Sequence, residues 1–340
     1  MSALMLKTGE LALGQSPACH AVRVLPSLLR RLDLADQRAQ GPVLGLCRIG
    51  VGSLWLANLH WKVPPSFGQS SGGGLFKYSE SVSRHSPFGP FTWITEQIVL
   101  PNFQFFGWVT LISETVIAML LLVGYRTKLA ALAGAMLSVP IMLSVIYYDR
   151  ADEWSWSYLL MIIANLGVYA SDGGAHLGLD GVRRGPAQAA TSAIRAAGIV
   201  TVAIGVLGLF VSRSVAFAGS RVALLGSDAG FVNDNGDLVR RWELKFLWFN
   251  PLWALLTLAL GLLVLLGTRL RWGSRAGGAG LAMLAVVIMA MRTFDYVRND
   301  GAVQAVATAS NAAVWGALAL AVLLPDAALR RGSSASADAR

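Results

Sequence analysis

FQFFGWVTLISETVIAMLLLVG, residues 103–124, is an almost unbroken apolar stretch that carries one carboxylate, Glu114, near its centre. A bilayer core takes about 20 helical residues, so this stretch is long enough to cross a membrane as one helix. At the centre of such a helix an unpaired carboxylate costs roughly 2.5 to 3.5 kcal/mol. Glu114 therefore needs a polar partner, a wet cavity or a proton, and it is the first candidate for a functional residue.

The rest of the chain has the composition of a polytopic membrane protein. Of its 340 residues 55% are hydrophobic and 14% are charged, and the mean hydropathy is +0.56. Ordinary soluble domains do not combine these values. The net charge of +9 is spread in short basic clusters between apolar segments, a pattern that sets orientation in a membrane. The sequence thus predicts contact with membrane lipid and no nucleic-acid partner.

Eight segments are candidates for membrane-spanning helices, and the predicted fold class is an all-α integral membrane protein. The basic clusters that flank the short loops place both termini in the cytoplasm by the positive-inside rule. The first apolar run follows several arginines and begins only near Pro42, so no cleavable signal peptide is expected. The predicted spans are residues 43–62, 103–124, 128–148, 155–172, 193–217, 244–268, 276–293 and 302–325.

Near-constant offsets between the two halves of the chain predict a tandem duplication. Arg195 follows Arg48 by 147 positions, and Asn311 follows Asn165 by 146. The basic cluster that begins at Arg269 follows the one that begins at Arg126 by 143, and the same offset places Thr257 opposite Glu114. We therefore expect two parallel four-helix bundles, with the intramembrane carboxylate kept only in the first. The predicted organisation is a cytoplasmic segment 1–40, bundles 41–182 and 190–328, and a disordered tail 329–340.

Two long outer connections carry their own signals. The first ends in an apolar-aromatic stretch around Trp93, which favours a short helix lying in the membrane interface. The second places an Asn-Gly step, at Asn235 and Gly236, between two apolar pairs, which predicts a β-hairpin turn. Beyond Arg331 the chain is too polar and small to fold.

Arg48 is the candidate partner of Glu114. It lies about five residues inside the cytoplasmic start of the first span, whereas Glu114 lies about ten residues from the cytoplasmic end of the second. At ~1.5 Å per residue the two depths differ by roughly 7 Å, which a long side chain can bridge. The pair is either a structural clamp or a proton or headgroup site beside a quinone. Asn165 would join it from the fourth span, as interhelical glue or as a ligand contact.

Trp61 and Lys62 close the first span, where such residues usually anchor a helix at the headgroups and can instead form a site that faces the outside. The histidines follow no ligand spacing, so neither metal nor haem is predicted. Cys19 and Cys47 form no CxxC pair, so redox chemistry would depend on a borrowed cofactor.

The order and spacing of several short motifs in residues 41–182 resemble the DoxX/DoxD family, which includes the small subunit of thiosulfate:quinone oxidoreductase. The resemblance implies a bacterial or archaeal membrane subunit with quinone as cofactor, a redox partner subunit and electrons from thiosulfate. Arg48 and Glu114 are then the candidate catalytic residues, and Asn165, Trp61, Lys62 and Tyr158 the candidate cofactor-binding residues. The motifs are Leu46-Cys47-Arg48-Ile49-Gly50-Val51-Gly52 with Trp55 and Trp61-Lys62, Glu114 with Leu120 to Thr127, Trp154 to Tyr158 with Asn165, and Leu177-Gly178-Leu179-Asp180.

Other functions remain compatible with the same features. A parallel repeat with a midplane charge is equally natural in a non-enzymatic transporter or a membrane scaffold. A structural assembly factor would use Glu114 for stability alone. Fold-level analogy does not by itself establish an activity.

Overall fold

The computed structural model describes residues 40–148, 155–225, 230–232, 238–241, 246–268, 270, 272–297 and 303–337. It divides into two units, Met1–Gly41 and Pro42–Arg340. In the first unit only residues 40 and 41 are described, and both are helical. The predicted cytoplasmic segment 1–40 thus lies almost wholly outside the described residues.

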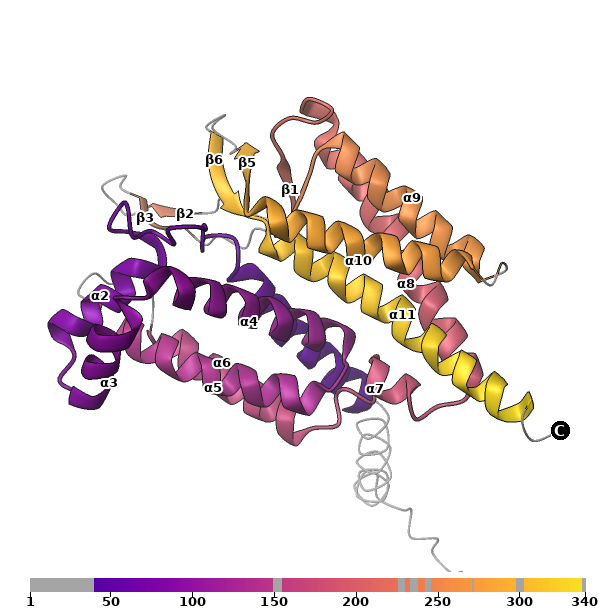
Figure 1. The fold of residues 1–340 in the computed structure, drawn as a ribbon, viewed down its shortest axis with the longest axis horizontal. Helices are drawn as coiled ribbons and strands as arrows, with labels where there is room; N and C mark the ends of the chain where they lie inside the picture. Colours follow the sequence, from indigo (N-terminus) through magenta and orange to yellow (C-terminus); the bar gives the residue numbers. More distant parts are fainter. Residues whose placement is uncertain are drawn as a thin grey trace, which may run out of the picture. The chain divides into compact units, whose positions relative to one another are not determined.

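The second unit is built from helices (Figure 1). Its first helix covers residues 42–57 and is followed by turns up to residue 61. It also contains two short helical segments, the π-helix η1 (Thr95–Val99) and the 3₁₀-helix η2 (Ser212–Ser214). The remaining α-helices are α2 (Gly74–His85), α3 (Gly89–Ile94), α4 (Phe103–Val123), α5 (Thr127–Ile146), α6 (Ser155–Ala170), α7 (Leu179–Val182), α8 (Ala187–Val211), α9 (Pro251–Gly267), α10 (Gly273–Met291) and α11 (Ala309–Ala337).

Five of the described helices are long and apolar enough to cross a membrane, namely α4, α5, α8 extended by η2, α10, and α11 as far as Arg330. α6 and α9 are apolar and shorter. The outward faces of α4, α5 and α10 carry large apolar side chains such as Phe105, Met136 and Met283, which are 65%, 67% and 71% exposed. Exposed apolar side chains on several long apolar helices are typical of a surface that faces lipid. The chain is a multi-pass membrane protein.

The first bundle consists of helix 42–57, α4, α5 and α6. α5 packs against both α4 and α6. Helix 42–57 reaches α4 at Gly52, where a Cβ would lie 3.0 Å from the backbone nitrogen of Leu122. It reaches α6 through Trp55, whose indole Nε1 donates to Asn165 Oδ1 at 3.4 Å. The four helices therefore close into one bundle.

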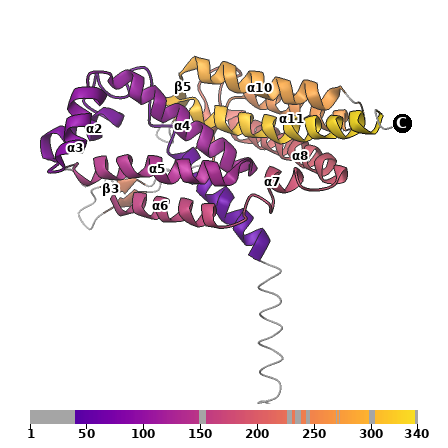
Figure 2. The ribbon, with the colours of Figure 1, turned by 60° about the horizontal axis from the view of Figure 1, so that its bottom comes forward.

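The second bundle, α8 to α11, closes in the same way, because α8 packs on α9, α9 on α10, α10 on α11 and α11 on α8. The two bundles meet where α11 packs along α4, and these helices lie beside each other in both views (Figures 1 and 2). At that contact a Cβ on Gly316 would lie 2.6 Å from Met119 Sδ. Small residues thus bring the helices close together.

Among the described residues, three two-stranded antiparallel sheets lie in the connections of the second half, and the predicted all-α fold omits two of them. β1 (Val222–Leu225) pairs with β4 (Phe246–Phe249), and β5 (Thr293–Val297) pairs with β6 (Val303–Ala307). β6 falls inside the span predicted from residue 302, whereas α11 begins only at Ala309. A hydropathy window counts apolar residues and cannot separate a short apolar strand from the start of a helix.

The predicted hairpin of the second outer connection is confirmed in its pairing. β2 (Gly230–Val232) pairs with β3 (Leu238–Arg241), while the turn residues between them lie outside the described residues. The aromatic stretch of the first connection forms α3 and η1, and Trp93 there is 59% exposed. A helix was predicted at this place, and its interfacial location stays a prediction.

α11 continues to Ala337, into the segment 329–340 for which a disordered tail is predicted. Extending an existing helix costs far less than nucleating one, and the packed part of α11 supplies the nucleus. Alanine, the best helix former, recurs near this end at Ala335 and Ala337.

Candidate functional site

Glu114 forms a buried ion pair with Lys62. α4 carries Glu114 in its interior, and Glu114 Oε2 lies 2.8 Å from Lys62 Nζ, with the two side chains 0% and 1% exposed. Lys62 follows the end of the first helix, donates to the carbonyl of Asn58 at 2.7 Å and lies 4.3 Å from the Trp61 ring centroid. Removing two charges from water is expensive, and mutual attraction in a low-dielectric interior offsets that expense. The pair therefore joins the turn after the first helix to the middle of α4.

The predicted pair of Arg48 with Glu114 is wrong. Arg48 Nη1 donates to the carbonyl oxygens of Leu121 and Leu122, the latter at 2.9 Å. The last carbonyls of α4 have no partner within the helix and carry partial negative charge, so they attract a cation. Seven residues, or about 10 Å of helix rise, separate Glu114 from Leu121. Depth estimates alone bring the two groups within reach, but the end of α4 offers the arginine nearer acceptors.

Arg48 also holds the loop that follows α6. Its Nε donates to the carbonyl of Gly173 at 3.2 Å and its Nη2 to that of Leu177 at 2.7 Å, and the side chain is 0% exposed. One guanidinium therefore ties the first helix, the end of α4 and this loop together. We call this group of contacts the Arg48 junction.

Glycine and aspartate complete the Arg48 junction. Gly124 has a φ of 66°, and a Cβ there would lie 2.7 Å from Arg48 Cζ. The carboxylate of Asp180 accepts from the backbone nitrogens of Arg126 and Thr127, both at 2.9 Å, and so caps the start of α5. The Asp180 nitrogen in turn donates to the carbonyl of Gly124 at 2.8 Å. Motif segments that are far apart in the sequence meet at this one place.

Asn165 lies apart from the charged residues. Its Oδ1 accepts from Trp55, and its Nδ2 donates to the carbonyl of Met161 at 2.8 Å. A Cβ at Gly134 would lie 2.4 Å from Asn165 Oδ1, so the glycine makes room for the amide. The geometry is that of a polar link between helices, and a cofactor contact of Asn165 stays a prediction.

Trp61 and Tyr158 belong to one aromatic cluster. Trp61 packs edge-on against Tyr78, with ring centroids 6.1 Å apart, and its indole donates to Asn58 Oδ1 at 3.0 Å. Tyr158 is 6% exposed and lies in the same apolar cluster as Tyr78. The structure thus brings two of the predicted cofactor-binding residues together.

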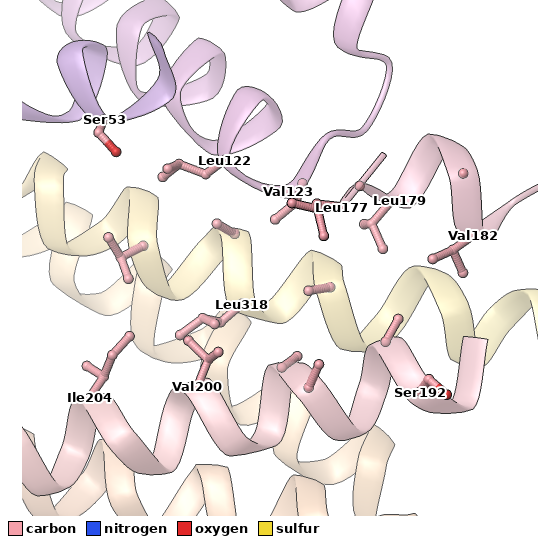
Figure 3. A pocket seen from close by; sticks show the side chains of 18 of the residues that line it. Ser53, Leu122, Val123, Leu177, Leu179, Val182, Ser192, Val200, Ile204 and Leu318 are labelled. Atoms are coloured by element: carbon pink, nitrogen blue, oxygen red, sulfur yellow. The ribbon is translucent and has the colours of Figure 1, made fainter. Parts of the chain in front are cut away.

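An open groove of about 800 Å³ runs between the two bundles (Figure 3). Leu122 and Val123 lie on one side of it, Val200 and Ile204 of α8 lie on the other, and Leu318 of α11 lies between them. Only two of its lining residues, Ser53 and Ser192, have polar side chains. None of the six predicted site residues lines the groove, but Arg48 holds the carbonyls of two that do, Leu122 and Leu177.

Sequence reasoning missed the groove, since it arises only where the two bundles meet. The one sequence signal is a row of alanines on α8, at Ala189, Ala193 and Ala196, which are spaced at about one helical turn. Such a row leaves a helix face without bulk. It does not indicate what lies opposite.

Sequence reasoning also missed Arg221, a buried cation outside the spans. Its guanidinium lies 4.4 Å from the Phe294 ring centroid and 5.1 Å from that of Trp253. Burial lowers the pKa of Arg221, and the charge of Asp295 opposes that shift. Stacking on two aromatic faces stabilises the cation in this position.

Comparison with known proteins gives one match. Residues 70–192 match the family model described as TQO small subunit DoxD. The matched segment covers roughly a third of the chain and contains Glu114, Gly124, Asn165 and Asp180, whereas Arg48 and Lys62 precede it. No curated protein and no solved structure matches the chain. This part of the first bundle is therefore similar to the DoxD family.

Proposed function

We propose that the chain is a membrane subunit of a quinone-linked oxidoreductase and that the groove binds the isoprenoid tail of the quinone. The observation that carries the proposal is the apolar groove beside a segment similar to the DoxD family. Its volume lies in the range of about 300 to 1,000 Å³ that is usual for small-molecule sites. We place the chain in the cytoplasmic membrane, with both termini inside.

The lining residues fit the tail better than the ring. An isoprenoid chain needs only apolar surface, which Leu122, Val200 and Leu318 supply. The two carbonyl oxygens of a quinone ring also need hydrogen-bond donors, and the groove offers the hydroxyl of Ser192, since that of Ser53 already donates to the carbonyl of Ile49 at 3.0 Å. A bound quinone would supply the acceptor for two electrons.

In this proposal Arg48 is a positioning residue and not a catalytic one. By holding the carbonyls of Leu122 and Leu177 it fixes two side chains of the groove wall. The catalytic role predicted for Glu114 stays a prediction, since Glu114 lies eight residues, or about 12 Å, along α4 from Leu122. The stability and activity of the double variant Lys62→Leu and Glu114→Thr test whether Glu114 is catalytic.

Electrons would come from a partner subunit, with thiosulfate as the donor that the family description suggests. We further propose that the two bundles arose by duplication of a four-helix unit and that the second copy is structural. A transporter or scaffold remains the alternative function, and the experiment below separates it from the redox proposal.

The test fills the groove without touching the core. Ala196 lines the groove from an exposed position on α8, so Ala196→Trp adds bulk there and leaves the buried helix contacts in place. We expect a loss of at least tenfold in photo-crosslinking by an azido-quinone and a parallel loss of thiosulfate-dependent quinone reduction in membranes. The matched control is Val206→Trp, since Val206 is 51% exposed on α8 and does not line the groove.

Quinone reduction that is the same in membranes with and without this chain would refute the redox proposal. Crosslinking that Ala196→Trp leaves intact would refute the groove as the quinone site. Solute uptake by proteoliposomes without any redox partner would favour the transporter instead.

A further inference from the structure

A basic pocket of about 350 Å³ lies where α5 begins and α7 ends. Four basic and two acidic side chains line it, so its net charge is positive. Asp180 is occupied by the backbone of α5, and Asp172 lies 3.7 Å from Arg184. The charged lining residues are Arg126, Lys128, Arg183, Arg184, Asp172 and Asp180.

Three of the cations remain available for a ligand. Within the part of the chain that the structure describes, Arg126, Lys128 and Arg183 form no salt bridge, and all three are exposed. The Arg183 guanidinium lies 5.4 Å from the Tyr125 ring centroid, which holds it at the pocket. These side chains can turn toward an anion at little conformational expense.

The floor of the pocket offers a further donor. Thr127 lines it, is 2% exposed, and its Oγ1 has no hydrogen-bond partner among the described residues. The backbone N–H groups of Arg126 and Thr127 already donate to Asp180, so the Thr127 hydroxyl is the donor that the floor adds.

Apolar surface adjoins the pocket on both sides. Leu129 lines it and is 57% exposed, and Leu132 and Met136 continue the same exposed stripe along α5. On α7, Leu179 and Val182 face the groove between the bundles, whereas Asp180 faces the basic pocket. The pocket therefore lies at the boundary between apolar and polar surroundings, at the level of lipid headgroups.

We propose that this pocket binds the phosphate of an anionic phospholipid, with one acyl chain along the α5 stripe. A soluble anion would need the charges alone, whereas a phospholipid also uses the apolar stripe that begins at Leu129. The site is separate from the quinone groove and does not depend on the redox function. Each basic residue near an anionic headgroup contributes about 1 kcal/mol.

Native mass spectrometry of the full chain in detergent micelles tests the proposal, with phosphatidylglycerol and phosphatidylcholine as probes. The double substitution Lys128→Gln and Arg183→Gln is expected to weaken phosphatidylglycerol retention about thirtyfold and to leave phosphatidylcholine retention unchanged. The single substitution Arg126→Gln is an independent variant with an expected loss of about fivefold. Arg213→Gln is the control, since it removes an exposed cation beyond the far end of α8.

Equal losses for Arg213→Gln would show that net charge, and not the pocket, holds the lipid, and would overturn the proposal. Equal losses of both lipids would overturn it as well. Displacement of phosphatidylglycerol by millimolar inorganic phosphate would assign the pocket to a free anion instead of a lipid. Thermal unfolding in phosphatidylcholine micelles, unchanged among the variants, establishes that the fold is intact.

Discussion

The two bundles have the same four-helix packing but carry different side chains at equivalent buried positions. In the first, Lys62 and Glu114 form a buried ion pair. In the second, the predicted offsets place Leu209 opposite Lys62 and Thr257 opposite Glu114. Thr257 is 0% exposed, donates to the carbonyl of Trp253 at 2.8 Å and accepts from Trp315 Nε1 at 3.1 Å. A neutral hydroxyl is therefore sufficient at this position, so the bundle does not need the charges to close.

The arginines differ in the same way. Arg48 is 0% exposed and holds the Arg48 junction, whereas Arg195, its predicted counterpart, is exposed on α8. One feature is shared. Asp180 caps the start of α5. Asp326 follows Asp180 by the same 146 positions that separate Asn311 from Asn165, and it accepts from Ser274 Oγ at the start of α10. A common framework thus carries the buried Lys62–Glu114 pair and the fully buried Arg48 in the first bundle, and neutral or exposed residues at the equivalent positions of the second.

Removing Arg48 should have the largest effect on stability. Arg48→Leu leaves the carbonyls of Leu122, Gly173 and Leu177 without their donor, and we expect a loss of about 4 kcal/mol in the free energy of unfolding. Arg195→Leu should change it by less than about 0.5 kcal/mol. Denaturation with sodium dodecyl sulfate in mixed micelles measures both. Equal losses would remove the contrast between the bundles.

Neutralising Glu114 should cost less. Glu114→Gln leaves Lys62 as a buried charge, which keeps the Asn58 carbonyl and the Trp61 ring, and we expect a loss of about 3 kcal/mol. Copying the second bundle, with Lys62→Leu and Glu114→Thr together, should restore stability to within about 1 kcal/mol of the native chain, because a neutral pair needs no compensation.

The double variant Lys62→Leu and Glu114→Thr distinguishes a catalytic role of Glu114 from a structural role of the ion pair. Native stability together with lost quinone reduction would assign Glu114 a catalytic role. Native stability together with native activity would leave the pair a structural link that evolution kept in one bundle. If the double variant were less stable than Glu114→Gln, a threonine could not replace Glu114 in the first bundle, contrary to the inference drawn from Thr257 in the second.

The length of the apolar stretches predicted a largely helical membrane protein, because lipid forces each span to satisfy its own backbone. The same reasoning could not choose the partner of Glu114. Depth along the membrane normal is one coordinate and does not determine which groups are in contact. It also takes no account of the carbonyls at the end of α4, which accept from Arg48. Lys62 is predicted either to anchor the first span at the headgroups or to form a site that faces the outside, whereas the turn after residue 57 directs its side chain inward to Glu114.

The order of the motifs was informative where single residues were not. Gly124 comes from one motif and Gly178 and Asp180 from another, and the Arg48 junction explains why the two motifs occur together. The groove and the basic pocket depend on how helices distant in the sequence meet, and no local pattern encodes that.

The smallest predicted effect concerns Gly124, and it tests whether the Arg48 junction is one unit. Gly124→Ala forces a side chain onto a φ of 66° and against Arg48 Cζ, so we expect a loss of about 2 kcal/mol. Gly50→Ala, in a helix with open space around it, should be neutral or stabilise by up to about 1 kcal/mol.

Part of the Gly124→Ala loss comes from contact with the arginine, so in an Arg48→Leu background it should shrink by about 1 kcal/mol, which leaves the strain and the contact with Gly178 Cα at 2.8 Å. In the second bundle, Gly267→Ala should also destabilise, since a Cβ there would lie 1.7 Å from the Ser274 nitrogen. That loss should be the same with and without Arg195→Leu, because the arginine takes no part in the contact. Unfolding free energies of the four single and two double variants measure both couplings. A coupling between Gly267 and Arg195 as large as that between Gly124 and Arg48 would show that the two arginines act alike, and the contrast between the buried arginine of the first bundle and the exposed one of the second would then fail.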